Sequence, residues 1–236
     1  MRPRPKKHRV ERYETVNKYM VSTIKDLDCT VPEVMRRTGE GRIVNLEKSY
    51  DPSMWNSPLR LEIGCGKGAF ISGLSQKFPN DRLLALELAP DVMLMAMEKC
   101  NSLNCENVKF YRCDATIVDS LIPENSVDVL YLNFSDPWPK ARTAKRRLTA
   151  VPFLEKYKKV LKDGAKIYFK TDNLPLFEFS IEQFKEAGLQ LNEVCYDLHN
   201  SPLASENIET EYEKNFSGKG FTINYLEATV SKKPVL

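Results

Sequence analysis

Short apolar runs alternate with helix-like patterns along most of this chain. From residue 59 on, runs rich in aliphatic side chains predict strands at 59–63, 82–87, 108–112, 127–132 and 165–170. The stretches between them carry apolar residues three and four positions apart, and they end near Pro79, Gly164 and Gly188. This alternation is typical of a parallel sheet wound by helices, so we expect a doubly wound α/β fold.

The end of the chain has a different pattern. Two further strand-like runs, 189–198 and 221–230, follow each other with no helix-length apolar pattern between them. We expect them to form an antiparallel pair at one edge of a mostly parallel, seven-stranded sheet. Their connection, 199–220, is long for a compact domain and is a candidate functional loop. The predicted organisation is a basic arm and extension at 1–58 and one α/β domain at 59–236.

Composition excludes several classes of protein. The 236 residues contain 6 cysteines without a CxxC pair and 2 histidines, so we expect no metal site and a reducing, cytoplasmic environment. The positively charged N-terminus has no apolar segment behind it, and no run of residues predicts a membrane span or a secretory signal. We expect a monomer or a homodimer.

Positive charge is concentrated in two places, although the net charge is only +3. Residues 1–12 and 140–147 are both rich in Lys and Arg. The simplest interpretation of such runs is a disordered arm at the N-terminus and a charged first turn of a helix at 140–147. Two of them in one modestly charged chain favour a polyanionic partner.

A glycine-rich segment, LEIGCGKGAF, follows the first predicted strand. Gly64 and Gly66 allow a tight turn and a close backbone approach to a ligand at the carboxyl edge of the sheet. Together with Ala69 they also satisfy the dinucleotide fingerprint GxGxxA, and Glu87 lies where a ribose would be bound. The glycines alone therefore leave NAD and S-adenosylmethionine open as cofactors.

Acidic residues favour S-adenosylmethionine. Glu62 precedes the glycines, where a carboxylate repels a pyrophosphate and attracts the ammonium group of S-adenosylmethionine. Glu87 and Asp114 follow the next two predicted strands, which suits ribose hydroxyls and an adenine amino group. An NAD-linked oxidoreductase is the alternative that the glycine pattern allows.

The segment NFSDPWPK, residues 133–140, holds a carboxylate at the end of another predicted strand. The two prolines restrict the backbone around Asp136, and Trp138 offers a flat face on which a base can stack. Phe134 and Trp138 either stack on bases or fill the core under the loop. An acid held rigidly beside a basic run indicates chemistry on a nucleic acid.

Four motifs together carry a family resemblance: LEIGCGKG, NFSDPWPKxRxxKRRL, FKTDN and TEYE. Across residues 59–230 the chain resembles the bacterial tRNA (guanine-N7)-methyltransferase family. The resemblance implies the Rossmann-like class I methyltransferase fold, S-adenosylmethionine as the cofactor, and tRNA as the partner. It also implies methyl transfer to N7 of a guanosine in the tRNA variable loop.

The resemblance also implies roles for individual residues. It implies cofactor contacts from Glu62, Glu87, Asp114 and Asp136. It implies guanosine or tRNA contacts from Lys140, Asp172, Thr210, Glu211, Tyr212 and Glu213. It implies an RNA-contacting element formed by Arg142, Lys145, Arg146 and Arg147.

N7 of guanine has an available lone pair, so methylation there requires no general base. We expect Asp136 to be the catalytic residue closest to the transfer, with Asp172 and Glu213 binding the base or offsetting its developing charge. Asp172 is alternatively a helix N-cap. Two other hypotheses remain: methylation of another RNA position or of protein, and an inactive RNA-binding module.

Overall fold

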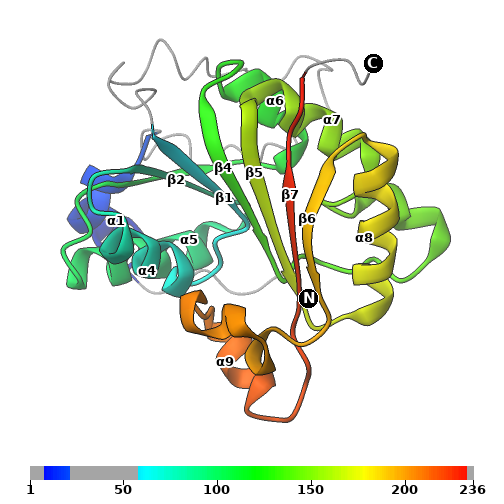
Figure 1. Cartoon of the computed structure of the whole chain (residues 1–236). Helices are drawn as coiled ribbons and strands as arrows, with labels where there is room; N and C mark the ends of the chain where they lie inside the picture. The colour runs from blue at the N-terminus through cyan, green and yellow to red at the C-terminus, as the bar shows by residue number, and fades with distance from the viewer. Residues whose placement is uncertain (1–7, 22–57, 233–236) are drawn as a thin grey trace.

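One mixed sheet organises residues 8–21 and 58–232, the residues that this computed structural model describes. The strand order is β3-β2-β1-β4-β5-β7-β6 (Figure 1). The strands are β1 (Leu59–Ile63), β2 (Arg82–Glu87), β3 (Val108–Arg112), β4 (Val127–Asn133), β5 (Leu161–Thr171), β6 (Gln190–Cys195) and β7 (Asn224–Thr229). Neighbours among β1 to β5 pair parallel, and β7 pairs antiparallel with β5 and β6. The predicted fold class is confirmed.

Helices cover both faces of the sheet, as Figure 1 shows. Contacts place α1 (Arg9–Val16), α4 (Ala69–Lys77) and α5 (Pro90–Ser102) on one side, and α6 (Val118–Leu121), α7 (Val151–Val160) and α8 (Leu174–Glu186) on the other. Strand side chains alternate between these layers, because successive residues point to opposite faces. In β2, Leu84 and Leu86 join the core of the α7 and α8 side, whereas Leu83 and Ala85 join the core of the α4 and α5 side.

The described part of the N-terminal extension belongs to the second of these cores. Tyr13 is fully buried, and its hydroxyl donates to the carbonyl of Pro90 at the start of α5. Arg12 adds an ion pair with Glu98, at 2.6 Å. Residues 9–16 therefore form part of the helical layer. Residues 1–7 of the basic run and residues 22–57 of the predicted extension lie outside the described residues.

The connection between β6 and β7 contains helices that the apolar pattern did not predict. They are η6 (Leu198–Asn200), η7 (Pro202–Glu206) and α9 (Glu211–Ser217). Thr210 and Glu213 form a capping box at the start of α9, in which each side chain accepts a hydrogen bond from the other residue's backbone. The helix is too short to show an apolar period, and its signal in the sequence was this capping pair.

Short 3₁₀ helices complete the described elements: η1 (Asn17–Tyr19), η4 (Ala115–Ile117) and η5 (Ala141–Arg146). None of the helices in the described ranges combines the length and the apolar character that crossing a bilayer requires. The carboxyl ends of β1, β2, β4 and β5 meet at one edge of the sheet, and α9 lies at that edge, at the lower end of Figure 1. This edge gathers the residues that the sequence singled out.

Candidate active site at the carboxyl edge of the sheet

Glu62, near the end of β1, has a buried carboxylate with one oxygen left without a partner. The residue is 1% exposed. Its Oε1 accepts a hydrogen bond from Nδ2 of Asn133 at 3.1 Å, and no described residue donates to its Oε2. Burial raises the pKa of Glu62 to about 8, against the lowering effects of Asn133 and Lys170. A cationic ligand group at Oε2 would satisfy this oxygen and favour the ionised carboxylate.

The glycine loop after β1 requires glycine for its backbone and for its packing. Gly64, Gly66 and Gly68 have φ values of 78°, 56° and 87°, which side chains with a Cβ rarely adopt. A Cβ on Gly68 would lie 2.8 Å from Cα of Ala96 in α5. The amide of Gly64 donates to the carbonyl of Leu86 at 2.8 Å. The loop therefore lies tightly against the end of β2 and leads directly into α4.

Glu87 and Asp114 lie at the same edge, and both accept hydrogen bonds from backbone amides. Glu87 accepts from Gly66 at 3.0 Å and from Ala89 at 2.9 Å, so it fixes the glycine loop. Asp114 accepts from the amide of Thr116 at 2.9 Å. Carboxylate oxygens accept more than one hydrogen bond each, so both residues can also bind ligand hydroxyl or amino groups. Three of the four predicted cofactor acids, Glu62, Glu87 and Asp114, thus lie at the ends of the neighbouring strands β1, β2 and β3.

The loop after β4 holds Asp136 in a constrained backbone. Phe134 and Trp138, on either side of it, have φ values of 50° and 40°, a left-handed conformation that non-glycine residues seldom adopt. Arg147 fixes the loop by donating to the carbonyls of Pro137 at 2.9 Å and Trp138 at 3.2 Å. Asp136 is exposed, and it forms no hydrogen bond or ion pair with a described residue.

Asp172 lies beside this loop. The amide of Phe134 donates to the carbonyl of Lys170 at 2.8 Å. Asp136 comes two positions after Phe134, and Asp172 comes two positions after Lys170. Asn173 is the N-cap of α8, because its Oδ1 accepts from the amide of Leu176 at 2.9 Å. Asp172 is therefore not the cap, and its side chain accepts from the hydroxyl of Tyr212 at 3.1 Å.

A buried ion pair joins the end of β5 to α9. Lys170 and Glu213 are 3% and 0% exposed, and their charged atoms are 2.6 Å apart. Nζ of Lys170 also donates to Oδ1 of Asn207 and to the carbonyl of Ile208, both at 2.9 Å. Burial lowers the pKa of Lys170. For Glu213, burial is outweighed by its hydrogen-bonded partners, and the pKa lies below its ordinary value.

The carboxylate of Glu213 has no oxygen left for a substrate. Besides Lys170, it accepts from Nδ2 of Asn207 at 2.6 Å and contacts Nε2 of His199 at 2.8 Å. The expected base contact from Glu213 therefore does not fit this structure, because four protein groups, with the amide of Thr210 as the fourth, surround the carboxylate. Lys170, His199 and Asn207 were not singled out from the sequence. The sequence did offer one signal: Lys170 is a lysine at the end of a mostly apolar predicted strand, and buried lysines are rare unless they are paired.

Thr210 and Glu211, which were expected to contact the substrate, also form hydrogen bonds within the protein. Thr210 caps α9, and Glu211 accepts from the amide of Ala69 at 3.1 Å and pairs with Lys99. Glu211 thus fastens α9 to the start of α4. Tyr212 is the most exposed residue of this motif, with 41% of it exposed.

The basic run divides into exposed and structural residues. Lys140, Arg142, Lys145 and Arg146 are exposed, and the guanidinium of Arg146 lies 5.1 Å from the ring centre of Trp138. Arg147, expected to contact RNA, is half-buried over the ring of Phe179 at 4.2 Å and is bonded to the loop carbonyls. These two bonds stabilise the loop, and the RNA contact expected of Arg147 stays a prediction.

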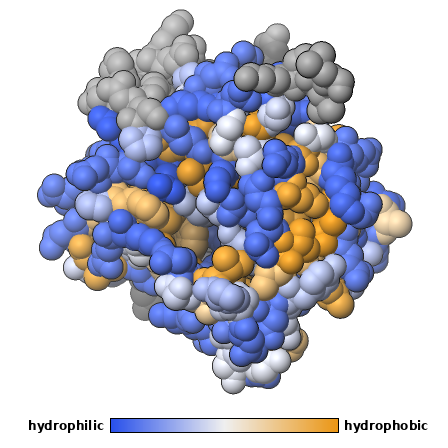
Figure 2. Space-filling view, viewed as in Figure 1, coloured by the Kyte–Doolittle hydropathy of each residue, from blue (hydrophilic) through white to orange (hydrophobic). Residues whose placement is uncertain are grey.

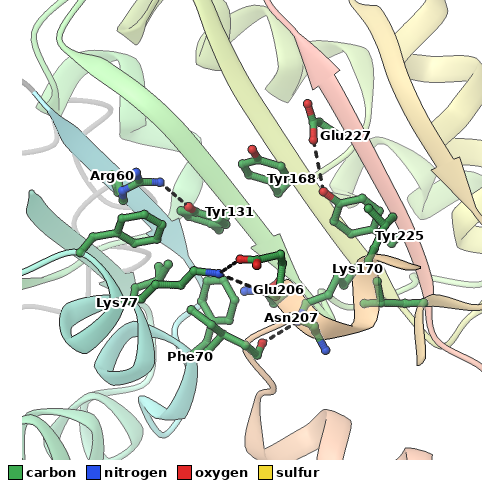
Figure 3. A pocket seen from close by; sticks show the side chains of 16 residues that line it. Arg60, Phe70, Lys77, Tyr131, Tyr168, Lys170, Glu206, Asn207, Tyr225 and Glu227 are labelled. Atoms are coloured by element: carbon green, nitrogen blue, oxygen red, sulfur yellow. Dashed lines mark hydrogen bonds and ion pairs between the residues drawn. The ribbon is translucent and has the colours of Figure 1, made fainter. Parts of the chain in front are cut away.

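Next to this edge, a pocket of about 510 Å³ opens on the sheet face beside α4 (Figure 3). Tyr131, Tyr168 and Tyr225, on three neighbouring strands, form its floor, with ring centres 5.3 Å and 6.2 Å apart. Figure 2 shows separate areas of hydrophobic side chains on this side of the molecule, with hydrophilic side chains between and around them. Lys170 lies at the end of the pocket, and its bond to Asn207 closes that end toward the carboxyl edge.

Metal ligation and thiol chemistry have no visible support among the described residues. No group of three His, Cys, Asp or Glu side chains in the described ranges could hold a metal ion. Burial raises the pKa of Cys65 and of Cys113, so both thiols stay protonated.

Comparisons with known proteins agree with this geometry. Residues 56–226 match the protein family described as "Putative methyltransferase". A relative from Brevibacillus brevis, named tRNA (guanine-N(7)-)-methyltransferase, is 43% identical over 174 residues, which are 74% of this chain and 81% of the relative. One from Bacillus subtilis with the same name is 46% identical over 165 residues, 70% of this chain and 77% of the relative.

Solved structures show the same fold at low sequence identity. The 16S rRNA methyltransferase KamB superposes with a TM-score of 0.56 at 17% identity, over 75% of this chain and 89% of that one. A SAM dependent methyltransferase from Aquifex aeolicus gives 0.52 at 16% identity, over 78% and 96% of the two chains. The family match decides between the two cofactor classes that the glycine loop left open. With its sheet order, its acid-lined carboxyl edge and this match in view, the chain belongs to the putative methyltransferase family.

Proposed function

We propose that this chain transfers a methyl group from S-adenosylmethionine to N7 of a guanosine in the variable loop of tRNA. The observation that carries the proposal is a set of three acids at the carboxyl ends of the neighbouring strands β1, β4 and β5. Asp136 and Asp172 have no cation partner among the described residues, and Glu62 has a buried oxygen without a partner. The name shared by relatives that are more than 40% identical supports the same activity.

The residues at the edge fit the cofactor. Glu62 would hold the ammonium group, Glu87 the ribose hydroxyls and Asp114 the adenine amino group, while Gly64 and Gly66 allow a close backbone approach. The bound cofactor supplies an electrophilic methyl group on a sulfonium centre. The chain must exclude water from this group and orient the acceptor toward it.

The acceptor requires orientation and charge stabilisation rather than deprotonation. Asp136 and Asp172 are placed to accept hydrogen bonds from N1 and the exocyclic amine of guanine, and to offset the positive charge that develops on the purine. No base is needed, which agrees with protonated thiols at Cys65 and Cys113 and with a His199 that contacts Glu213. Glu213, Thr210 and Glu211 act as positioning residues for Tyr212.

The exposed cations would bind the RNA backbone. Lys140, Arg142, Lys145 and Arg146 follow Asp136 directly, so phosphates held there would bring the variable loop toward the acids. The protein would act as a monomer or a homodimer. A tRNA substrate also implies that the protein works in the cytoplasm.

The reaction, the substrate and the position can be tested together. Unfractionated tRNA lacking this modification should accept label from S-[methyl-³H]adenosylmethionine, and cleavage at N7-methylated guanosine should map the label to one variable-loop position. Label on another base, or on protein in place of RNA, would contradict the proposal.

Asp136→Asn should lower kcat by about 100- to 1000-fold, the usual cost of removing one preorganised electrostatic group, and should leave tRNA binding nearly unchanged. Single-turnover methyl transfer and a filter-binding titration measure the two quantities. Glu124→Gln removes an exposed acid at the opposite edge and serves as the matched control. A near wild-type rate for Asp136→Asn would show that another residue stabilises the transfer.

Cofactor binding should release about one proton at about pH 6.5. Glu62 has a pKa of about 8 in the free protein, so it is mostly protonated at that pH, and it must ionise to pair with an ammonium group. Calorimetric titration with S-adenosylhomocysteine, in buffers of different ionisation enthalpy, counts the protons. Glu62→Gln should bind more weakly and release none. Equal proton release by wild type and variant would remove Glu62 from this role.

A further inference from the structure

We infer that an aromatic column beside Asp136 binds an unpaired nucleotide next to the target guanosine. The column consists of Phe134, Tyr212, Phe216 and Phe221. The inference rests on the tRNA substrate proposed above and adds a recognition site to it.

The four rings are in continuous contact. Ring centres of Phe134 and Tyr212 are 5.1 Å apart, those of Tyr212 and Phe216 are 4.1 Å apart and nearly parallel at 15°, and Phe221 meets Phe216 edge-on at 5.4 Å. Tyr212 and Phe216 are four positions apart in α9, which places them on one face of the helix. The column therefore starts two residues before Asp136 and leads outward across α9.

The outer end of the column is open to solvent. Phe221 is 50% exposed and Tyr212 is 41% exposed. A single exposed aromatic residue needs no explanation in a soluble protein. Here, however, two of the three large aromatic residues that are exposed among the described residues, Tyr212 and Phe221, belong to one column. The column also adjoins the proposed active site, because the hydroxyl of Tyr212 donates to Asp172.

Positive charge accompanies the column. Nζ of Lys219 lies 5.0 Å from the ring centre of Phe216, and Lys214 is exposed on α9. Neither lysine forms an ion pair with a described residue. Aromatic faces beside unpaired cations are the combination by which proteins bind single-stranded nucleic acids. A protein partner is less well matched, because lysines are depleted at the centres of protein interfaces.

The proposed reaction gives this site a purpose. A guanosine that presents N7 to a buried methyl donor must leave the base stack, and its neighbour then loses a stacking partner. A ring such as Phe221 can replace that partner. Stacking of this kind is independent of base identity, because every base has a π-face.

Kinetics of Phe221→Ala test the inference directly. The variant should raise the KM for tRNA by about 5- to 100-fold, the usual effect of losing one stacked aromatic ring, and should change kcat by less than about 2-fold. Phe221→Trp should restore the KM. Leu103→Ala removes an equally exposed apolar side chain after α5 and should leave the KM unchanged. The half-exposed position of Phe221 means that the variants should fold normally.

A double-mutant cycle that combines Phe221→Ala with modified tRNA identifies the nucleotide that stacks on Phe221. Transfer RNA with an abasic residue on the 5′ or the 3′ side of the target guanosine should raise the KM of the wild type, and Phe221→Ala should add nothing for one of these two RNAs. An unchanged KM for Phe221→Ala on intact tRNA, or fully additive losses with both abasic RNAs, would overturn the inference. If the wild type methylates guanosine N7 while either result is found, only this inference fails; a wild type that does not methylate tRNA overturns the proposed function itself.

Discussion

The buried ion pair between Lys170 and Glu213 is the constraint on which the carboxyl edge depends. It joins the end of β5 to a segment, 198–217, that the sheet does not otherwise hold by strand pairing. Burying two charged groups away from water would destabilise the fold if either group lacked hydrogen-bond partners. Here Asn207, Ile208, His199 and the start of α9 complete their hydrogen bonds. The pair therefore fixes the position of α9, and with it Tyr212 and Glu211.

The other features of the edge follow from a division between acids that have partners and acids that do not. Glu87, Glu211 and Glu213 accept hydrogen bonds from backbone amides and lysines, and these bonds fix the glycine loop, α4 and α9. Glu87 can bind ligand hydroxyl groups as well. Glu62 keeps one buried oxygen free. Asp136 is held in place by its backbone alone, between two left-handed residues. Catalytic groups held in this way need little rearrangement when charge moves onto the substrate.

Most of the fold could be predicted from the sequence, because both faces of the central strands are covered and their apolar runs are therefore nearly continuous. The first four strands begin where the pattern predicted them. β6 and β7 proved shorter than predicted, because buried apolar residues also lie beyond the paired strands: Leu198 begins η6, and Ile223 directly precedes β7. Helix α9 was missed, since seven residues are too few to show an amphipathic period.

The site could be predicted only as a set of residues at one edge. The acids Glu62, Glu87, Asp114, Asp136 and Asp172 do lie there, because parallel strands end at a common edge. Membership of a motif did not distinguish residues available to a substrate from residues that stabilise the site. Arg147 and Glu213 belong to the same motifs as Lys140 and Tyr212, yet tertiary hydrogen bonds use both of them inside the protein. The bonds of Arg147 span 9 and 10 residues and the pair of Glu213 with Lys170 spans 43, and the apolar pattern of the sequence encodes neither.

Hydrogen–deuterium exchange of Glu213→Gln measures the central claim most directly. The substitution keeps the shape of the side chain and leaves Lys170 without its counter-charge, a change that costs about 3–5 kcal/mol when a buried pair is broken. Amides of 198–217 should exchange at least about tenfold faster, whereas amides of β1, β2 and β4 should keep their protection. Glu206→Gln, which breaks the exposed pair with Lys77 in the same segment, should change little. Unchanged protection of 198–217 in Glu213→Gln would contradict the account.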